Sequence, residues 1–325
     1  MSTAKRQVQF PGLTSGYRIA EADRYCCLLD EQPAPLVHEQ FTEADDLINP
    51  QLLTPAKVEQ MGSRFLNDWF SQVYPVVWVN DPVKDFPNPF WVSEELLARI
   101  ERVRQQPECI RQLSSREIAV LQQAGILLSP AKTKERRQYW QDNVARVSEK
   151  FQSDGYALLT GVIHPYHLPA LRQYYRRLLE TGGMIYGDSQ TKRRYITHNE
   201  PVSMFFHKQL TSLTGRICQR PLKRSYVYVS AYQGGASLPR HKDRQQCEYS
   251  ISLLIDFVPE LSGQCPWPLH LVTSDADVTM YQSLGDAIFY RGRQLPHYRD
   301  QLPEEMSSTS ILFHFVDEDF PDSLD

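Results

Sequence analysis

The chain lacks a long apolar run, an excess of one charge and any cysteine pattern that would bind metal. No apolar stretch approaches the roughly 20 residues that a membrane-spanning helix needs, and the N-terminus lacks the apolar core of a signal peptide. The net charge of −4 gives no electrostatic reason to expect a nucleic-acid or membrane partner. Six cysteines without CxxC spacing indicate reduced thiols, so we expect a cytoplasmic protein.

The composition is that of an ordinary globular protein. The chain has 325 residues, of which 41% are hydrophobic and 23% charged, enough to bury a large core. No internal repeat or low-complexity tract is present. We expect a mostly helical N-terminal region over residues 1–145, serving as a cap or as a peptide-holding module. Residues 146–325 are expected to form a separate domain.

The N-terminal half shows helix signals between polar segments. Residues 1–50 are polar and rich in proline, which suggests an extended arm. Thr54 and Pro55 are typical of a helix start, and residues 74–79 predict a strand. A loop follows over residues 80–90, and Ser93 opens another helix.

The segment from Leu113 to Pro130 has a recognisable pattern. Ser114 and Glu117 have the spacing of a capping box, and Gly125 is expected to end the helix before a short strand. This order occurs in winged-helix modules, including some that hold a peptide by strand addition. A helical cap packed on the second domain is the alternative.

The C-terminal half is dominated by strands. Residues 156–159 predict a first strand, helices are expected over residues 168–179 and 203–218, and the polar stretch 182–201 is interpreted as a loop. The remaining expected strands cover residues 226–232, 249–253, 269–273, 278–282, 286–290 and 308–315. Short strands separated by Gly and Pro turns favour a closed or two-sheet β-structure.

A metal site is the main functional prediction. His241 and Asp243 are two residues apart between two predicted strands, and side chains at that spacing point to the same face of an extended chain. His297 follows another strand and can provide a third ligand. Two histidines and one carboxylate with open coordination positions are typical of non-haem Fe(II) oxygenases. His198 and Glu200 have the same two-residue spacing and form a rival pair.

The sequence resembles a known superfamily in two places. Phe151–Glu180 looks like the opening of the phytanoyl-CoA dioxygenase and prolyl-hydroxylase-like families. The pattern Y-x-x-G-x5-H-x-D, from Tyr232 to Asp243, and GDAIFYRGRQLPH, ending at His297, are similar to the Fe(II)/2-oxoglutarate oxygenase superfamily. The resemblance covers about Phe151–Phe315 and implies a double-stranded β-helix (jelly-roll, cupin-like) core with flanking helices, an α+β fold. It also implies Fe(II) and 2-oxoglutarate as cofactors.

The resemblance implies an oxygenase that hydroxylates a C–H bond of a small metabolite or a peptide residue. His241, Asp243 and His297 would be its catalytic iron ligands. Two other functions remain open. One is a cupin-like metal-binding sensor or binding protein without turnover. The other is a metal-dependent hydrolase or isomerase on the same fold, with Glu248 as a candidate base.

The cosubstrate anchor departs from the family pattern. Many members carry Arg or Lys about ten residues after the last histidine ligand, where the side chain pairs with a carboxylate. Here residues 300–325 contain neither type. The arginine fork matches a carboxylate, so Arg299 is our first candidate and Arg293 the next. Tyr232 and Ser310 can add hydroxyl contacts to 2-oxoglutarate.

Four further residues are candidates for substrate binding. They are polar or aromatic and lie near the predicted metal ligands or in the polar stretch before the strands: Arg194, His198, Tyr228 and Arg244. His314 is expected to be a structural histidine of the barrel, and His207 a packed or exposed helix residue rather than a ligand. Cys247 lies close enough to the site to be of interest, although a free cysteine is more often a packing residue.

Overall fold

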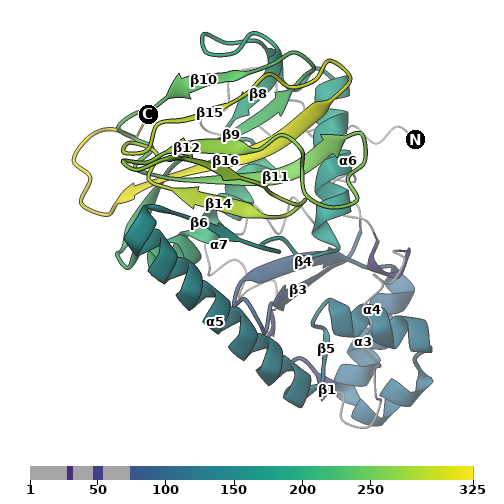
Figure 1. The fold of residues 1–325 in the computed structure, drawn as a ribbon. Coiled ribbons are helices and arrows are strands. Elements are labelled where there is room, and N and C mark those ends of the chain that lie inside the picture. The colour runs from purple at the N-terminus through teal and green to yellow at the C-terminus, as the bar shows by residue number, and fades with distance from the viewer. Residues whose placement is uncertain (1–27, 32–46, 54–73, 325) are drawn as a thin grey trace. The chain divides into compact units, whose positions relative to one another are not determined.

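A computed structural model describes residues 28–31, 47–53 and 74–324 (Figure 1). The described chain forms two compact units. The C-terminal unit consists of residues 143–164 and 171–324, and the N-terminal unit consists of residues 28–31, 47–53, 74–142 and 165–170. All side chains discussed below as part of the candidate site belong to the C-terminal unit.

Two antiparallel sheets form the C-terminal unit. The larger sheet has the strand order β6-β14-β11-β16-β9-β8-β7. Its strands are β6 (Tyr156–Leu159), β7 (Ile185–Tyr186), β8 (Arg194–His198), β9 (Leu222–Tyr232), β11 (Tyr249–Val258), β14 (Ala287–Tyr290) and β16 (Ser307–Asp317). The smaller sheet has the order β10-β15-β12-β13, with β10 (Leu238–His241), β12 (Leu269–Val272), β13 (Asp277–Met280) and β15 (His297–Arg299).

The eight strands from β9 to β16 are divided equally between the two sheets. β9, β11, β14 and β16 lie in the large sheet, and the other four lie in the small one. Eight antiparallel strands shared by two sheets in this way make a jelly-roll arrangement. The mixed helix-and-sheet class expected from the sequence is confirmed, and so is each of the expected strands in this half.

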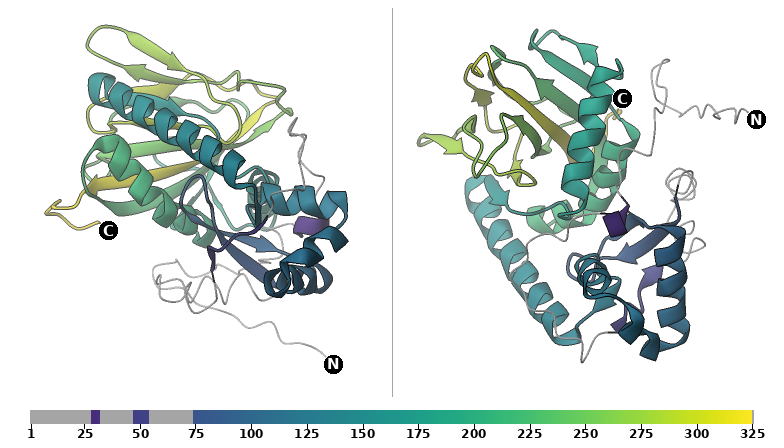
Figure 2. Two further views of the ribbon diagram at one scale, coloured as in Figure 1. Left: turned by 90° about the horizontal axis from the view of Figure 1, so that it is seen from below. Right: turned by 90° about the vertical axis from the view of Figure 1, so that its right-hand side faces the viewer.

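Alternation of side chains decides which face of the large sheet is apolar. In β16, Phe313 and Phe315 contact His207 of helix α7 (Pro201–Cys218), with ring centroids 5.7 and 4.7 Å apart. The alternate residues Ser310, Leu312 and His314 point the other way and line a cavity. Successive side chains of a strand point to opposite faces, so an alternating sequence gives one sheet a helix-covered face and a polar face. Figure 2 shows α7 along the covered face.

The two helices expected in the C-terminal half are present as α6 (His167–Glu180) and α7. The long helix α5 (Pro130–Asp154) ends before Gly155, which has a φ of +78°. Helix α6 follows β6. Its Arg172 and Arg176 both bind Asp256 of β11, which fixes the helix to the large sheet.

The N-terminal unit combines short helices with a three-stranded antiparallel sheet. The sheet has the order β2-β3-β4, and β5 pairs with β1. The elements are η2 (Leu29–Glu31), β1 (Leu47–Ile48), β2 (Leu52–Leu53), β3 (Val76–Asn80), β4 (Pro87–Trp91), α3 (Glu94–Gln105), η5 (Pro107–Gln112), α4 (Ser115–Gln123) and β5 (Leu127–Leu128). The predicted capping box of Ser114 and Glu117 is present, and Gly125 ends that helix with a φ of +73°.

Several predictions need correction. Residues 182–201 were expected to be a loop, but they contain β7 and β8. The expected loop at residues 80–90 contains β4, an edge strand that tolerates its two prolines because its outer edge needs few donors. Strands β2 and β3 lie beside it, so the described N-terminal residues combine helices with a small sheet. The expected helix at Thr54 and most of the expected arm lie outside the described residues.

No helix among the described residues is long and apolar enough to cross a membrane.

Candidate metal centre and its cavity

The pairing of β10 with β15 brings the predicted ligands together. His241 is the register partner of His297, and their rings are 4.3 Å apart between centroids. Asp243 follows β10, and its backbone N–H donates to the carbonyl of Gly292 over 3.0 Å. His297 lies far from His241 and Asp243 in the sequence, so the strand pairing is what assembles the group.

The three side chains offer one ligand atom each to a common point. The Asp243 Oδ1 atom lies 3.6 Å from His241 Nε2 and 3.5 Å from His297 Nε2. All three ligand atoms lie within 4.8 Å of one another. A transition metal with bonds of about 2.0–2.2 Å to nitrogen and oxygen can join atoms at such separations after small side-chain adjustments.

Hydrogen bonds fix both imidazoles in the form that a metal needs. His241 Nδ1 donates to the carbonyl of Pro239 over 2.8 Å, and His297 Nδ1 donates to the carbonyl of Leu295 over 3.0 Å. A proton held at Nδ1 leaves the lone pair on Nε2, the atom that faces Asp243. Outer hydrogen bonds of this kind orient metal-binding histidines and increase their basicity.

Asp243 is oriented in a similar way. Ser250 Oγ donates to Asp243 Oδ2 over 2.7 Å, which leaves Oδ1 to face the histidines. The hydroxyl has only one hydrogen, so His314 Nδ1 donates to Ser250 Oγ over 3.0 Å. Gly292 is packed against the same carboxylate, because a Cβ atom there would lie 2.2 Å from Asp243 Oδ2.

The local charges favour an ionised carboxylate. Burial would raise the pKa of Asp243, but hydrogen bonds from His241 and His297 and the charges of His297 and His314 hold it well below its ordinary value. Burial would lower the pKa of His241, yet the hydrogen bond with Asp243 raises it overall. A proton and a metal ion would compete for the same imidazole nitrogen.

The structure separates the rival pair. Glu200 is completely buried at the N-cap of α7, where its carboxylate accepts hydrogen bonds from the backbone N–H groups of Val202 and Ser203. The hydroxyls of Tyr174 and Tyr175 donate to the same carboxylate over 2.5 and 2.9 Å. Glu200 is thus fully used as a cap, while His198 faces the cavity.

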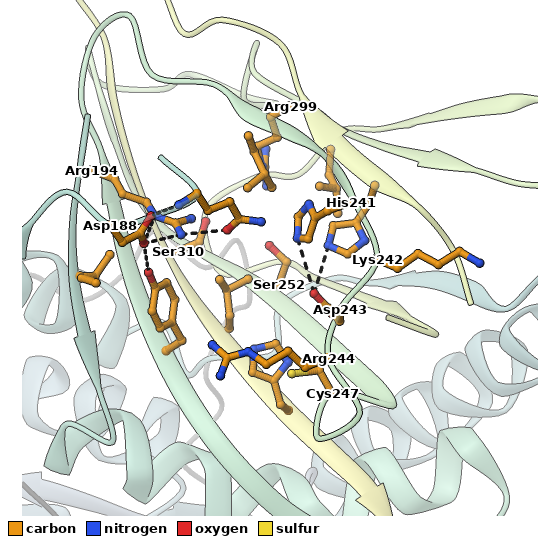
Figure 3. A pocket seen from close by; sticks show the side chains of 18 of the residues that line it. Asp188, Arg194, His241, Lys242, Asp243, Arg244, Cys247, Ser252, Arg299 and Ser310 are labelled. Carbon is orange, nitrogen blue, oxygen red and sulfur yellow. Dashed lines mark hydrogen bonds and ion pairs between the residues drawn. The ribbon is translucent and has the colours of Figure 1, made fainter. Parts of the chain in front are cut away.

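A cavity of about 500 Å³ opens beside the three ligands (Figure 3). Its walls come from strands of both sheets and from the segments that follow β7 and β10. All of the predicted substrate-binding residues line it, and so do Arg299, Tyr232 and Ser310. Other lining residues include Asp188, Ile196, Tyr226, Lys242, Cys247, Ser252, Leu269, Tyr290, Leu312 and His314.

Arg299 is a buried cation that contacts a backbone carbonyl, an amide oxygen and an aromatic ring, all of them neutral. Its guanidinium donates to the carbonyl of Trp267 over 2.6 Å and to Gln282 Oε1 over 3.4 Å, and it lies over the Trp267 ring. Within the described ranges, no carboxylate lies within ion-pair distance of it. Burial lowers its pKa from the ordinary value. A buried charge without a counter-ion is costly, so this site is suited to an anionic ligand.

Arg293, the second candidate anchor, lies elsewhere. Its guanidinium is 3.8 Å from Glu248, and it is not among the residues that line the cavity. Glu248 also accepts a hydrogen bond from the backbone N–H of Asp317 and does not line the cavity. The candidate base of the hydrolase hypothesis therefore does not face the ligands.

Arg194 is held in a network at the opposite wall. Its Nε and Nη2 atoms donate to Asp188 Oδ2 over 2.9 and 2.5 Å, and Nη1 donates to the Tyr232 hydroxyl over 3.0 Å. The Tyr228 hydroxyl donates to the same Asp188 oxygen over 2.6 Å. Arg194 is thus paired, and the network fixes the segment between β7 and β8 to the large sheet.

A second group of possible ligands shares Asp243 with Cys247 and His314. Burial raises the pKa of the Cys247 thiol to about 12, and the Tyr226 hydroxyl is hydrogen-bonded to its sulfur. The thiolate is the form that binds metal, and this thiol stays protonated near pH 7. His314 Nδ1 already donates a hydrogen bond to Ser250 Oγ. We therefore assign the metal centre to His241, Asp243 and His297.

Three residues of the site were missed in the sequence. Asp188 lay in a stretch interpreted as a loop, and Ser250 and Gly292 act only through their contacts with Asp243. The alternation over Tyr249–Leu253 indicated only that Ser250 lies on one face of a strand. No local signal distinguishes a serine that bonds a ligand from one that does not.

Comparisons with known proteins give similarity of fold. No protein-family model and no curated protein sequence matches this chain. One similar structure is a Trichoplax adhaerens prolyl hydroxylase in complex with a peptide of hypoxia inducible factor (TM-score 0.47, 16% identity, covering 56% of this chain and 94% of that one). Another is a Pseudomonas putida prolyl-4-hydroxylase (TM-score 0.45, 16% identity, 54% and 99%).

A third similar structure is a 2OG-Fe(II) oxygenase family oxidoreductase from Burkholderia pseudomallei (TM-score 0.43, 11% identity, 53% and 89%). Each of the three structures is similar to little more than half of this chain.

Proposed function

We propose that this protein is an Fe(II)- and 2-oxoglutarate-dependent oxygenase with a double-stranded β-helix core. It hydroxylates a C–H bond of a small metabolite or of a residue in a peptide. The observation that carries the proposal is the convergence of two Nε2 atoms and one carboxylate oxygen at the wall of a cavity. With iron and 2-oxoglutarate bound, O₂ oxidises a C–H bond while 2-oxoglutarate loses CO₂ and becomes succinate.

The donor set fits iron. Two imidazoles and one carboxylate on one side leave open positions for a cosubstrate and O₂, which is the pattern of non-haem Fe(II) oxygenases. His241, Asp243 and His297 would hold the metal. The Nδ1 hydrogen bonds keep each histidine in the required tautomer, and Ser250 keeps Asp243 Oδ1 directed at them.

Arg299 is the proposed anchor for 2-oxoglutarate. Its buried guanidinium lines the same cavity as the metal ligands and has neutral protein partners. Ser310 and Tyr232 also line the cavity and can donate hydroxyl hydrogens. The Arg194 guanidinium donates to the Tyr232 oxygen, which leaves the hydroxyl hydrogen free to bind an anion.

The two alternative functions differ from the proposed one because neither converts 2-oxoglutarate to succinate. A sensor or binding protein would bind metal without converting 2-oxoglutarate to succinate. A hydrolase would need a general base within reach of the metal. Glu248 pairs with Arg293 outside the cavity lining, which leaves that hypothesis without its candidate base.

Anaerobic titration with Fe(II) and 2-oxoglutarate tests the proposal. We expect a weak metal-to-ligand absorption band in the visible range that disappears when O₂ is admitted, together with formation of succinate. Asp243→Ala should lose bound iron and the band. Glu200→Gln, which changes the rival pair, should keep both. Iron binding without a band would refute the cosubstrate assignment, and loss of iron in Glu200→Gln alone would refute the ligand assignment.

A further inference from the structure

The charges that line the cavity do not balance. The lining contains four cations and two carboxylates, namely Arg194, Lys242, Arg244, Arg299, Asp188 and Asp243. Asp188 neutralises Arg194. On the proposed function, Asp243 serves the metal and Arg299 serves 2-oxoglutarate. Two positive charges next to the metal ligands are therefore left without an assigned anion.

Arg244 is the one of these two that points inward. Figure 3 shows its guanidinium turned toward the interior of the cavity, whereas the Lys242 chain extends away from it. The Arg244 guanidinium carbon lies 5.7 Å from the centroid of the Tyr226 ring. In the part of the chain that the structure describes, no carboxylate forms an ion pair with Arg244. A guanidinium placed over an aromatic ring keeps its hydrogen-bond donors free at the edges.

An aromatic wall continues from Arg244. The His198 ring lies 6.0 Å from that of Tyr226 and 4.5 Å from that of Tyr228, measured between centroids. Burial lowers the pKa of His198, and the charge of Arg244 lowers it further. The imidazole is therefore neutral near pH 7 and has one N–H to donate. The wall combines a cation, a neutral donor and two aromatic faces.

We infer that Arg244 and His198 form a subsite for an oxyanion of the substrate, a carboxylate or a phosphate carried on a flat or apolar body. Figure 3 shows Arg244 and Arg299 on opposite sides of the His241–Asp243 pair. An anion held at Arg244 leaves the Arg299 side of the cavity to the cosubstrate. The body of the substrate would lie against Tyr226 and Tyr228, next to the metal ligands. This inference rests on the proposed function for the assignment of Arg299.

Binding of a simple aromatic anion tests the subsite. The probe is benzoate, with benzamide as its neutral counterpart and inorganic phosphate to distinguish the two oxyanions. The protein is loaded with Mn(II) and saturated with 2-oxoglutarate. Paramagnetic relaxation of the probe's proton or phosphorus signals then reports binding close to the metal. We expect binding of benzoate or phosphate and none of benzamide.

Variants of Arg244 and of the nearby Lys242 show which of the two cations binds the anion. Arg244→Gln should weaken binding of the anion at least tenfold, because a charge-assisted hydrogen bond contributes about that much. Lys242→Gln should change it less than twofold. Equal binding by wild type and Arg244→Gln would overturn the inference, as would equal binding of benzoate and benzamide.

Failure of the proposed function is read from a different signal. The affinity for 2-oxoglutarate is measured separately in each variant by displacement of water from the Mn(II) centre. Absence of 2-oxoglutarate binding in the wild type would refute the proposed cosubstrate whatever benzoate does. Normal 2-oxoglutarate binding combined with Arg244-independent benzoate binding would refute the substrate subsite alone.

Discussion

At the scale of single residues, the site depends on contacts that place one atom correctly. Asp243 has two carboxylate oxygens, and Ser250 holds one so that the other faces His241 and His297. Arg299 lines the cavity, and its guanidinium is held in place by hydrogen bonds to two neutral acceptors. A change of one side chain at these positions should alter a ligand affinity more than it alters the fold.

The first prediction concerns Arg299. Arg299→Gln should raise the dissociation constant for 2-oxoglutarate at least tenfold, because charge-assisted hydrogen bonds contribute about 1.5–3 kcal/mol. The affinity for iron should stay near that of the wild type. Arg293→Gln is the matched control, since Arg293 pairs with Glu248 and does not line the cavity. Anaerobic titration of the visible band measures both variants, and a larger effect from Arg293→Gln would refute Arg299 as the anchor.

The second prediction concerns Gly292. A Cβ atom there would lie 2.2 Å from Asp243 Oδ2 and 2.7 Å from both Ser250 Oγ and the Cys247 carbonyl. Gly292→Ala must therefore displace the carboxylate, and we expect iron affinity to fall at least tenfold, in line with the effect of lost outer contacts at metal sites. Gly263→Ala is the control, because no atom lies within 4 Å of its Cβ position. An unchanged iron affinity in Gly292→Ala would show that the carboxylate does not need this space.

The sequence nominated the three candidate ligands, but it did not indicate the residues that support them. His241 and Asp243 are recognisable because spacing along a strand is a local property, and His297 is recognisable because it follows a clear strand pattern. Ser250 and Gly292 depend on which strands pair and in which register, and register is set by the whole sheet. His198 and Glu200 show the limit of local spacing. Although they have the same two-residue spacing as His241 and Asp243, Glu200 caps helix α7 and His198 lines the cavity, so the two do not form a joint ligand pair.

At the scale of elements, an ion pair between Asp188 and Arg194 joins the turn between β7 and β8 to the large sheet. Burial would raise the pKa of Asp188, but the Tyr228 hydroxyl, the Thr191 backbone N–H and Arg194 together lower it below 3.8. A lowered pKa means that the folded state binds fewer protons than the unfolded state. The stability that Asp188 contributes is thus fully present above pH 3.8 and is lost as the pH falls through the folded-state pKa.

The third prediction follows from that sign. Asp188→Asn should lower the melting temperature at pH 7, and it should lose less stability than the wild type as the pH falls from about 4 to about 2. Thermal denaturation followed by circular dichroism across this range measures the difference. Asp322→Asn, at an exposed position near the end of the described chain, controls for the loss of one acid. If the melting temperature falls equally with decreasing pH in the wild type and in Asp188→Asn, the prediction is contradicted.

The fourth prediction concerns the start of α7. Glu200 accepts two backbone N–H groups of the helix and two tyrosine hydroxyls, all buried. Glu200→Ala should reduce the free energy of unfolding by about 2 kcal/mol or more, since losing a cap costs about 1 kcal/mol and each unpaired buried group adds to it. Chemical denaturation measures the change. Glu305→Ala, at an exposed position, should stay within about 0.5 kcal/mol, and a similar small loss in Glu200→Ala would refute the capping role.

Elements were predictable where their pattern is regular. The strands from β9 to β16 alternate clearly, and the capping box of Ser114 and Glu117 marks its helix start. Two strands were missed for physical reasons. β7 has only two residues, both exposed, so the β7–β8 hairpin shows little alternation. β4 contains Pro87 and Pro89, which argue against a strand unless it lies at a sheet edge.

At the scale of the whole molecule, the two units share the chain in an unexpected way. Residues 165–170 lie in sequence between β6 and the main part of α6, yet they belong to the N-terminal unit. There Tyr166 donates to Gln123 Oε1 over 2.7 Å, and the His167 ring lies 5.1 Å from that of Phe90. The predicted boundary between residues 145 and 146 stays a prediction, and this segment shows what a cut there would expose.

The fifth prediction concerns removal of residues 1–142. All the cavity residues lie between positions 188 and 314, so the fragment should still bind iron and lose it when Asp243 is replaced by Ala. Its melting temperature should be lower than that of the full chain, because Tyr166, His167 and Ala170 are buried and would lose their partners. In the full chain, Tyr166→Phe should give a smaller loss of the same kind, about 1 kcal/mol for one hydrogen bond. A fragment as stable as the full chain would mean that residues 165–170 find other partners. A stable fragment without iron binding would mean that the N-terminal unit contributes to the metal site itself.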